Sequence, residues 1–82
     1  MPKIYRKNQK MRVKKRLTLY SDTQEPIEIQ EGNIFTVEYV KHYAQSQSSY
    51  YEMYSDILQL TVPIWNDVGH EAVDWHFEPV NG

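Results

Sequence analysis

The sequence predicts an all-β fold, a small barrel of about five antiparallel strands preceded by a basic N-terminal arm. Apolar and polar residues alternate at every second position through 34–43 and again through 55–80, as they do in half-buried strands. The turn-forming residues Glu31-Gly32-Asn33 and a polar break at 66–69 favour hairpin connections. The 82 residues make one domain, and seven Tyr, two Trp and two Phe supply its large side chains.

The first expected element is a flexible basic arm over residues 1–11, which a single β-barrel domain over 12–82 follows. Residues 1–10 show no hydrophobic period and carry few apolar side chains. Such a segment buries too little surface to offset the entropy cost of ordering it. We therefore expect the arm to lie outside the core.

The expected strands follow the alternation along the rest of the chain. They lie near 16–20, 34–43, 50–54, 55–65 and 72–78, with a short extended piece at 27–30. A single helical turn through 50–57 is the alternative for the third strand, because Tyr50, Met53, Tyr54 and Ile57 also follow helical spacing. Pro63 cannot donate a hydrogen bond to a ladder, so we expect its strand at a sheet edge or at a bulge.

The apolar faces of these strands are expected to form the core. The residues are Val13, Leu17 and Leu19 in the first strand, Phe35 and Val37 in the second, Leu58, Leu60, Val62 and Ile64 in the fourth, and Val73, Trp75 and Phe77 in the last. The alternation puts Tyr39 and Tyr43 on the same strand face as Phe35 and Val37. The last two strands are expected to pair as a hairpin around Asn66–Gly69 and to form the floor of the barrel.

Charge is distributed unevenly along the chain. Residues 1–16 carry eight Lys or Arg and no acid, a charge of +8. Residues 17–82 carry one base, Lys41, and all 11 acids, a charge of −10. That value exceeds the magnitude of roughly 2–8 that suffices for the solubility of a small domain. Halves of opposite sign indicate an interaction tail or a charged binding face.

Two short motifs resemble a known group of proteins. Ile29, Gly32, Phe35 and Val37 form the pattern I-x-x-G-x-x-F-x-V, and Trp75-x-Phe77-Glu78-Pro79 follows near the end of the sequence. Together they resemble SH3-like barrels, and among these the small accessory proteins of phages and other mobile elements of Gram-positive bacteria. The resemblance covers residues 12–80. It implies an SH3-like barrel and a phage or mobile-element origin, and it carries no catalytic residues.

The residues do not indicate an enzyme. The sequence has no cysteine, no glycine-rich phosphate loop and no serine in a nucleophile elbow. His70, Asp74 and His76 would share one face of a strand, where a solvent-facing polar row is a simpler interpretation than a metal site. We expect no enzymatic activity, no cofactor and no metal. No run approaches the ~18–20 apolar residues of a membrane span, so we expect a cytoplasmic protein, in the host bacterium if a phage encodes it.

The expected function is that of a protein-binding inhibitor or adaptor. An acidic, aromatic surface would dock on a basic protein that handles nucleic acid, because carboxylates steer the encounter and Tyr and Trp dominate interface energies. Such a surface imitates a nucleic-acid backbone. With the phage resemblance, it implies an anti-defence protein such as an anti-CRISPR, with a CRISPR or other defence nuclease as partner. The candidate residues are Glu38, Tyr39, Tyr43, Tyr50, Tyr51, Glu52, Tyr54, Asp56, Trp65, Asp67, Glu71 and Asp74.

Two alternatives remain open at this point. In the first, the barrel binds nucleic acid through phosphate contacts from its N-terminal arm. The residues would be Arg6, Lys7, Lys10, Arg12, Lys14, Lys15 and Arg16. In the second, the basic arm folds onto an acidic body, its own or a neighbour's, and the protein is a self-associating structural protein or homo-oligomer.

Overall fold

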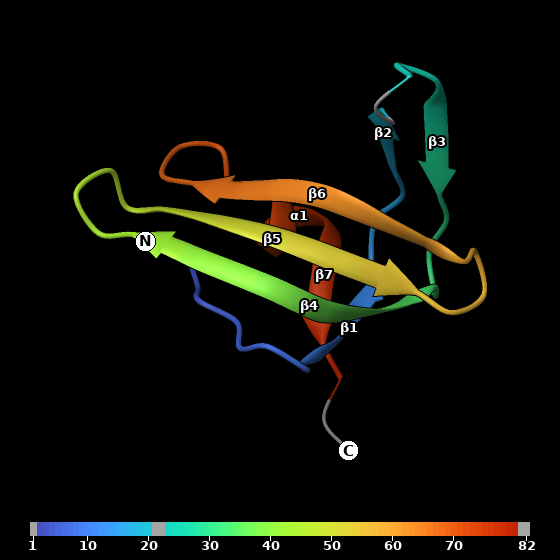
Figure 1. Ribbon diagram of the computed structural model, residues 1–82, viewed down its shortest axis with the longest axis horizontal. Helices are drawn as coiled ribbons and strands as arrows, with labels where there is room; N and C mark the ends of the chain where they lie inside the picture. The colour runs from blue at the N-terminus through green and yellow to red at the C-terminus, as the bar shows by residue number, and fades with distance from the viewer. Residues whose placement is uncertain (1, 21–22, 81–82) are drawn as a thin grey trace.

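The computed structural model describes residues 2–20 and 23–80. Within these ranges the elements are β1 (Lys10–Val13), β2 (Leu17–Tyr20), β3 (Pro26–Ile29), β4 (Ile34–Tyr43), β5 (Ser48–Ser55), β6 (Leu60–Asp67), α1 (Ala72–His76) and β7 (Phe77–Pro79). Five strands form an antiparallel sheet in the order β6-β5-β4-β1-β7, and β2 and β3 form a separate antiparallel pair (Figure 1). The all-β prediction is confirmed, with seven short strands in the described residues. The SH3-like detail stays a prediction.

Strands β4, β5 and β6 form a long meander. Their Val, Ile, Thr and Tyr residues favour a pleated, half-buried backbone, and β4 has the bounds that the alternation predicts. Buried residues occupy every second position from Ser49 to Ser55, so the helical alternative for 50–57 is wrong. Pro63 lies in β6, an edge strand, as expected for a residue without an amide hydrogen. Gly32 has a φ of 91° in the turn before β4, a conformation that glycine adopts without strain.

A β-bulge in β4 reverses the face to which its side chains point. Phe35 and Val37 are fully buried, but the pairing with β5 shifts register between Val37 and Tyr39. The extra residue, Glu38, puts the following positions on the opposite face. Tyr39 and Tyr43 are therefore 46% and 40% exposed, and the expectation that they share one face with Phe35 and Val37 is wrong.

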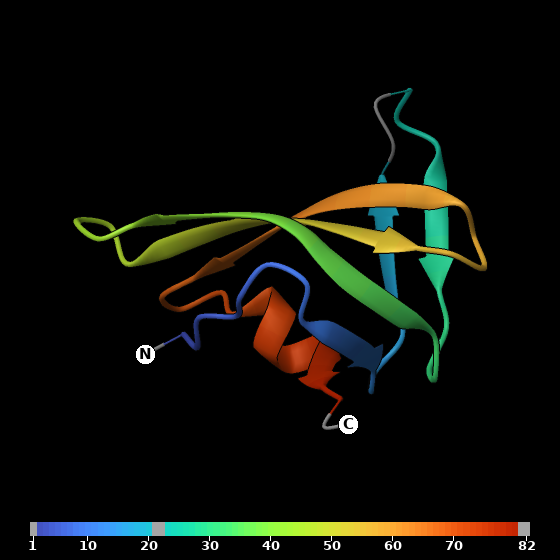
Figure 2. The ribbon, with the colours of Figure 1, turned by 60° about the horizontal axis from the view of Figure 1, so that its bottom comes forward.

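The core lies between the meander and a second layer. The sheet bends, so that the N-terminal segment, β1, α1 and β7 all lie beneath one face of β4–β6 (Figure 2). The buried apolar residues are Tyr5, Met11, Val13, Ile29, Phe35, Val37, Tyr51, Met53, Val62, Ile64, Val73 and Phe77. Phe35 meets Phe77 edge-to-face with ring centroids 5.7 Å apart, which joins the two layers. Leu17, Leu19 and Ile27 of the β2–β3 pair pack at the margin of this core.

Residues 2–9 pack against the domain, where the sequence predicts a flexible arm. Tyr5 is only 7% exposed, and its backbone N–H donates to the Tyr51 hydroxyl at 3.0 Å. The Asn8 N–H donates to the Val37 carbonyl at 2.7 Å, and the Val37 N–H donates to the Gln9 carbonyl at 2.9 Å. The segment thus extends the pairing of β1 with β4. Strand β1 itself begins at Lys10, earlier than the alternation predicts.

Residues 72–79 form a helical turn and a short strand in place of the predicted strand. Val73 and Phe77 are four residues apart and both face the core, whereas Trp75 points out and is 46% exposed. The expectation that Trp75 is a core residue is therefore wrong. Strand β7 pairs with β1 and not with β6, so the predicted hairpin around Asn66–Gly69 is wrong too.

Asn66 explains why this helix forms. The α1 residues have no acceptor from a local capping side chain, and Asn66 of β6 supplies one instead. Its Oδ1 accepts the backbone N–H groups of Val73 at 3.0 Å and Asp74 at 3.4 Å. Unpaired N–H groups in the first turn of a helix require such an acceptor. Within the described residues, no helix combines the length and apolar character that crossing a membrane requires.

Candidate functional site

The face of the β4–β6 meander that points away from the core carries most of the residues that the sequence singles out. Cross-strand pairing aligns Tyr39 with Glu52, Lys41 with Tyr50, and Tyr50 with Trp65. Because residues two apart share a face of a strand, one surface results. We call it the outer face, and its residues are Glu38, Tyr39, Lys41, Tyr43, Ser48, Tyr50, Glu52, Tyr54, Thr61, Pro63, Trp65 and Asp67.

Four aromatic rings are in contact on the outer face. Tyr50 lies between Tyr39, at a centroid distance of 6.1 Å, and Trp65, at 5.1 Å. Trp65 in turn lies 5.8 Å from Tyr43. Trp65 is 44% exposed, similar to Tyr39 and Tyr43. These four residues, the aromatic cluster, cross all three strands of the meander, so the sheet holds them at fixed spacing.

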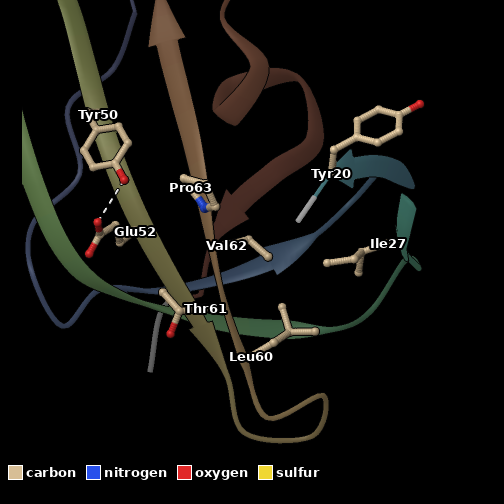
Figure 3. Close-up of a pocket in the computed structure, with 8 residues that line it drawn as sticks. All are labelled: Tyr20, Ile27, Tyr50, Glu52, Leu60, Thr61, Val62 and Pro63. Atoms are coloured by element: carbon tan, nitrogen blue, oxygen red, sulfur yellow. Dashed lines mark hydrogen bonds between the residues drawn. The ribbon is translucent and has the colours of Figure 1, made fainter. Parts of the chain in front are cut away.

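Carboxylates border the aromatic cluster, and hydrogen bonds orient two of them. The Tyr50 hydroxyl donates to Glu52 Oε2 at 2.8 Å (Figure 3), and the Thr61 hydroxyl donates to Glu38 Oε1 at 3.3 Å. Asp67 is the third carboxylate of the outer face. Lys41 is its basic residue, with Nζ 5.2 Å from the centroid of the Tyr43 ring. Three carboxylates and one ammonium group give the outer face a formal charge of −2.

A groove of about 370 Å³ continues the outer face toward the β2–β3 pair. Figure 3 shows the β6 residues Leu60 to Pro63 in the middle, with Tyr20 and Ile27 on one side of them and Tyr50 and Glu52 of β5 on the other. The side chains from β2 and β3 add apolar surface beside the acidic, aromatic one. The surface that is open to a partner is thus wider than the meander alone.

The basic residues of the N-terminal half lie on other elements. Lys10 and Arg12 are on β1, Lys14 to Arg16 are in the loop that follows, and all five are exposed. Arg12 Nε forms an ion pair with Glu78 Oε2 at 3.1 Å. The N-terminal segment and β1 lie on the far side of the core from the meander (Figure 2). The acidic outer face and this basic surface therefore belong to opposite layers of the molecule.

Four of the predicted site residues lie elsewhere. Tyr51 is fully buried beneath the sheet, with its ring 6.0 Å from that of Tyr5, and burial raises the pKa of its hydroxyl. Asp74 on α1 accepts the Tyr5 hydroxyl at 2.6 Å and the Lys3 backbone N–H at 3.0 Å. Glu71 precedes α1, and Asp56 lies in the β5–β6 turn. Tyr51 and Asp74 thus anchor the N-terminal segment.

Burial also raises the pKa of the Tyr5 hydroxyl, and its hydrogen bond to Asp74 adds to this shift. A carboxylate that accepts a hydrogen bond from a hydroxyl favours the protonated form of that hydroxyl. The Tyr5–Asp74 contact therefore depends on a protonated tyrosine.

The possible polar row of His70, Asp74 and His76 does not form, because α1 replaces the strand. His70 meets Trp75 edge-to-face with centroids 5.3 Å apart, and His76 Nδ1 lies 3.0 Å from the Lys15 carbonyl oxygen. Among the described residues, no three His, Asp or Glu side chains converge as metal ligands would.

The sequence interpretation missed Lys41, Ser48, Thr61 and Pro63 as members of the outer face. Lys41 follows from the alternation once the bulge at Glu38 is known, and the other three follow from the pairing of β5 with its neighbours. No protein-family model, no curated protein and no solved structure matches this chain.

Proposed function

We propose that this protein is a non-enzymatic inhibitor or adaptor whose outer face docks on a basic surface of a protein that handles nucleic acid. The observation that supports this proposal is the aromatic cluster, three of whose rings are 40–46% exposed in the middle of a carboxylate-bearing sheet. Monomeric domains seldom expose contiguous apolar surface without a partner for it.

The composition of the outer face matches that of protein interfaces. Tyr and Trp contribute large contact areas, and they lose little side-chain entropy on binding because only two torsions are fixed. The contacts of Tyr50 with Tyr39, Trp65 and Glu52 hold its ring in place before a partner arrives. This preorganisation lowers the entropy cost of association.

The charges of the outer face favour a basic partner. Glu38, Glu52 and Asp67 outnumber Lys41, so the face attracts cations over roughly the Debye length of 8–10 Å at moderate salt. Proteins that grip DNA or RNA present Lys and Arg for phosphate contacts. A carboxylate-bearing face that covers those residues competes with the nucleic acid, and inhibition follows from that competition.

The experiment compares Trp65→Ala with Trp75→Ala, a matched control with the same residue type and nearly the same exposure on α1. Tagged protein is incubated with a nuclease-treated bacterial lysate, captured proteins are identified, and their affinities are measured with purified components. We expect a nucleic-acid-handling protein to bind, and we expect its affinity to fall as the salt concentration rises. Trp65→Ala should reduce this affinity roughly 30-fold or more, and Trp75→Ala should leave it unchanged. Equal binding by both variants, or capture of no nucleic-acid-handling protein, would contradict the proposal.

A second candidate function, nucleic-acid binding through the basic surface, is favoured by one observation. Lys10 and Arg12 on β1 and the loop residues Lys14 to Arg16 are held on an ordered backbone beside one another. Under this alternative, replacing Lys14, Lys15 and Arg16 by alanine weakens the binding of a fluorescent oligonucleotide, measured by anisotropy, and lowers the salt dependence of that binding. Trp65→Ala leaves that signal unchanged.

A further inference from the structure

A hollow of about 440 Å³ lies at the end of the aromatic cluster nearest the β4–β5 turn. Its lining residues are Tyr43, Ser46, Ser48, Trp65 and Asp67. Two aromatic rings and a carboxylate thus border the same space, with two serines completing the wall. None of these five residues contributes to the buried apolar core.

The Asp67 carboxylate lacks part of its hydrogen bonding. Its Oδ1 is buried and accepts no hydrogen bond from the described residues. The Asp67 backbone is fixed, because its N–H donates to the His70 carbonyl at 3.1 Å and its carbonyl accepts the His70 N–H at 2.9 Å. This bridge fixes the backbone of Asp67 at the edge of the hollow. Because Oδ1 is closed to solvent, a cation in the hollow would stabilise this uncompensated negative charge through its electric field and not through a hydrogen bond to Oδ1 itself.

The rings of the hollow present a surface that suits a planar cation. Tyr43 and Trp65 are inclined by 30° to each other with centroids 5.8 Å apart, so two aromatic rings in mutual contact border the hollow. The chain's own Lys41 already lies over the Tyr43 ring, which shows that this ring accepts a cation. A guanidinium group is planar, stacks on aromatic faces and pairs with a carboxylate through two N–H groups, whereas an ammonium group does neither as well.

We infer that this hollow binds an arginine side chain, with the guanidinium stacked on Tyr43 and Trp65 and paired with Asp67. The inference rests on the proposed function for its partner, since it assigns the residue type by which a basic protein would engage the outer face. The binding chemistry itself requires only the hollow. The hollow excludes anions, because the Asp67 carboxylate repels them. It also discriminates against neutral side chains, which leave the charge of that carboxylate uncompensated.

The experiment titrates the full chain with three tripeptides and follows its NMR spectrum. The peptides are acetyl-Gly-Arg-Gly-amide, the same peptide with citrulline, which is neutral but nearly identical in shape, and the same peptide with lysine. We expect the arginine peptide to shift the Trp65 indole N–H and the Tyr43 ring signals and to leave the Trp75 indole unmoved. The citrulline peptide should bind about fivefold more weakly than the arginine peptide, and the affinity of the lysine peptide should lie between the two.

Asp67→Asn is the matched variant, since it keeps the shape and removes the charge. We expect it to weaken the arginine peptide about three- to fivefold, to the level of the citrulline peptide. The comparison of peptides on the unaltered chain decides the matter even if this variant does not fold. Equal binding of arginine and citrulline, equal binding of arginine and lysine, or shifts that omit Trp65 would each overturn the inference.

The two proposals fail separately. If the arginine peptide does not bind but Trp65→Ala still abolishes capture of a nucleic-acid-handling protein, the outer face docks without this arginine contact. If the arginine peptide binds as described and no such protein is captured, the arginine site stands and the proposed function does not.

Discussion

Replacing Tyr5 by alanine tests whether residues 2–9 belong to the folded domain. The Tyr5 side chain is 7% exposed, its ring contacts that of Tyr51, and its hydroxyl donates to Asp74. Truncating a buried aromatic residue to alanine costs about 3–5 kcal/mol. At about 0.05–0.15 kcal/mol per residue, the stability of the whole domain is only ~4–12 kcal/mol. Tyr5→Ala should therefore remove a quarter or more of it.

The measurement is urea unfolding followed by tryptophan fluorescence and circular dichroism. Ile4→Ala is the matched control, because Ile4 is the neighbouring residue and is 58% exposed; its cost should stay within about 0.5 kcal/mol. Tyr5→Phe keeps the ring and removes the hydrogen bond to a carboxylate, so it should cost about 1.5 kcal/mol. If Tyr5→Ala and Ile4→Ala unfold at the same urea concentration, the segment does not stabilise the domain.

Three further outcomes are expected. Phe77→Ala should cost about 3–5 kcal/mol and Trp75→Ala below about 1 kcal/mol in thermal unfolding, and the reverse order would restore Trp75 to the core. Because burial raises the pKa of Tyr5 and Tyr51 above the ordinary value of 10.0, the folded state keeps protons that the unfolded state releases. Below about pH 10 these two groups should therefore not change the free energy of unfolding. Above that pH the free energy of unfolding should fall by up to about 1.4 kcal/mol per pH unit for each tyrosine. Urea midpoints measured against pH should fall less steeply for Tyr5→Phe than for the unaltered chain. Asn66→Leu should cost about 2–4 kcal/mol and accelerate amide exchange at Val73, whereas unchanged exchange there would mean that α1 forms without this acceptor.

The strands of the meander could be predicted from the sequence because their signals are local. Alternation in 34–43 and the β-branched and aromatic residues there point to the same structure, and β4 has those bounds. The orientation of its second half could not be predicted. One extra residue at Glu38 exchanges the two faces, and its presence depends on the pairing with β5.

The two ends of the described chain were interpreted wrongly because long-range contacts determine them. Val73, Trp75 and Phe77 fit a strand by their alternation, but Val73 and Phe77 also fit one face of a helix. Asn66 decides between the two by accepting amide groups of α1. Tyr5 is a single aromatic residue in a basic stretch, and its partners Tyr51 and Asp74 are 46 and 69 positions away.

The candidate site was only partly accessible from the sequence for the same reason. Composition indicated an acidic, aromatic surface, and eight of the twelve candidate residues do share the outer face. Tyr50 and its neighbour Tyr51 lie on opposite faces of a strand, but which of the two faces the core depends on the pairing register, which the sequence does not contain. The aromatic cluster itself follows from cross-strand pairing.

The position of β1 between β4 and β7 has a consequence for how the chain acquires its structure. Strand β1 and Tyr5 are translated before Phe77 and Asp74, with which they pair, and more than sixty residues separate the partners. Until then β1, with Met11 and Val13, can pair with β4 on one side but has no β7 on the other. Contacts between such distant positions carry a large loop-closure entropy and slow the search for the native state. The nascent chain therefore completes its core only after α1 and β7 have been made, and during that interval its unpaired strand exposes apolar surface that chaperones bind.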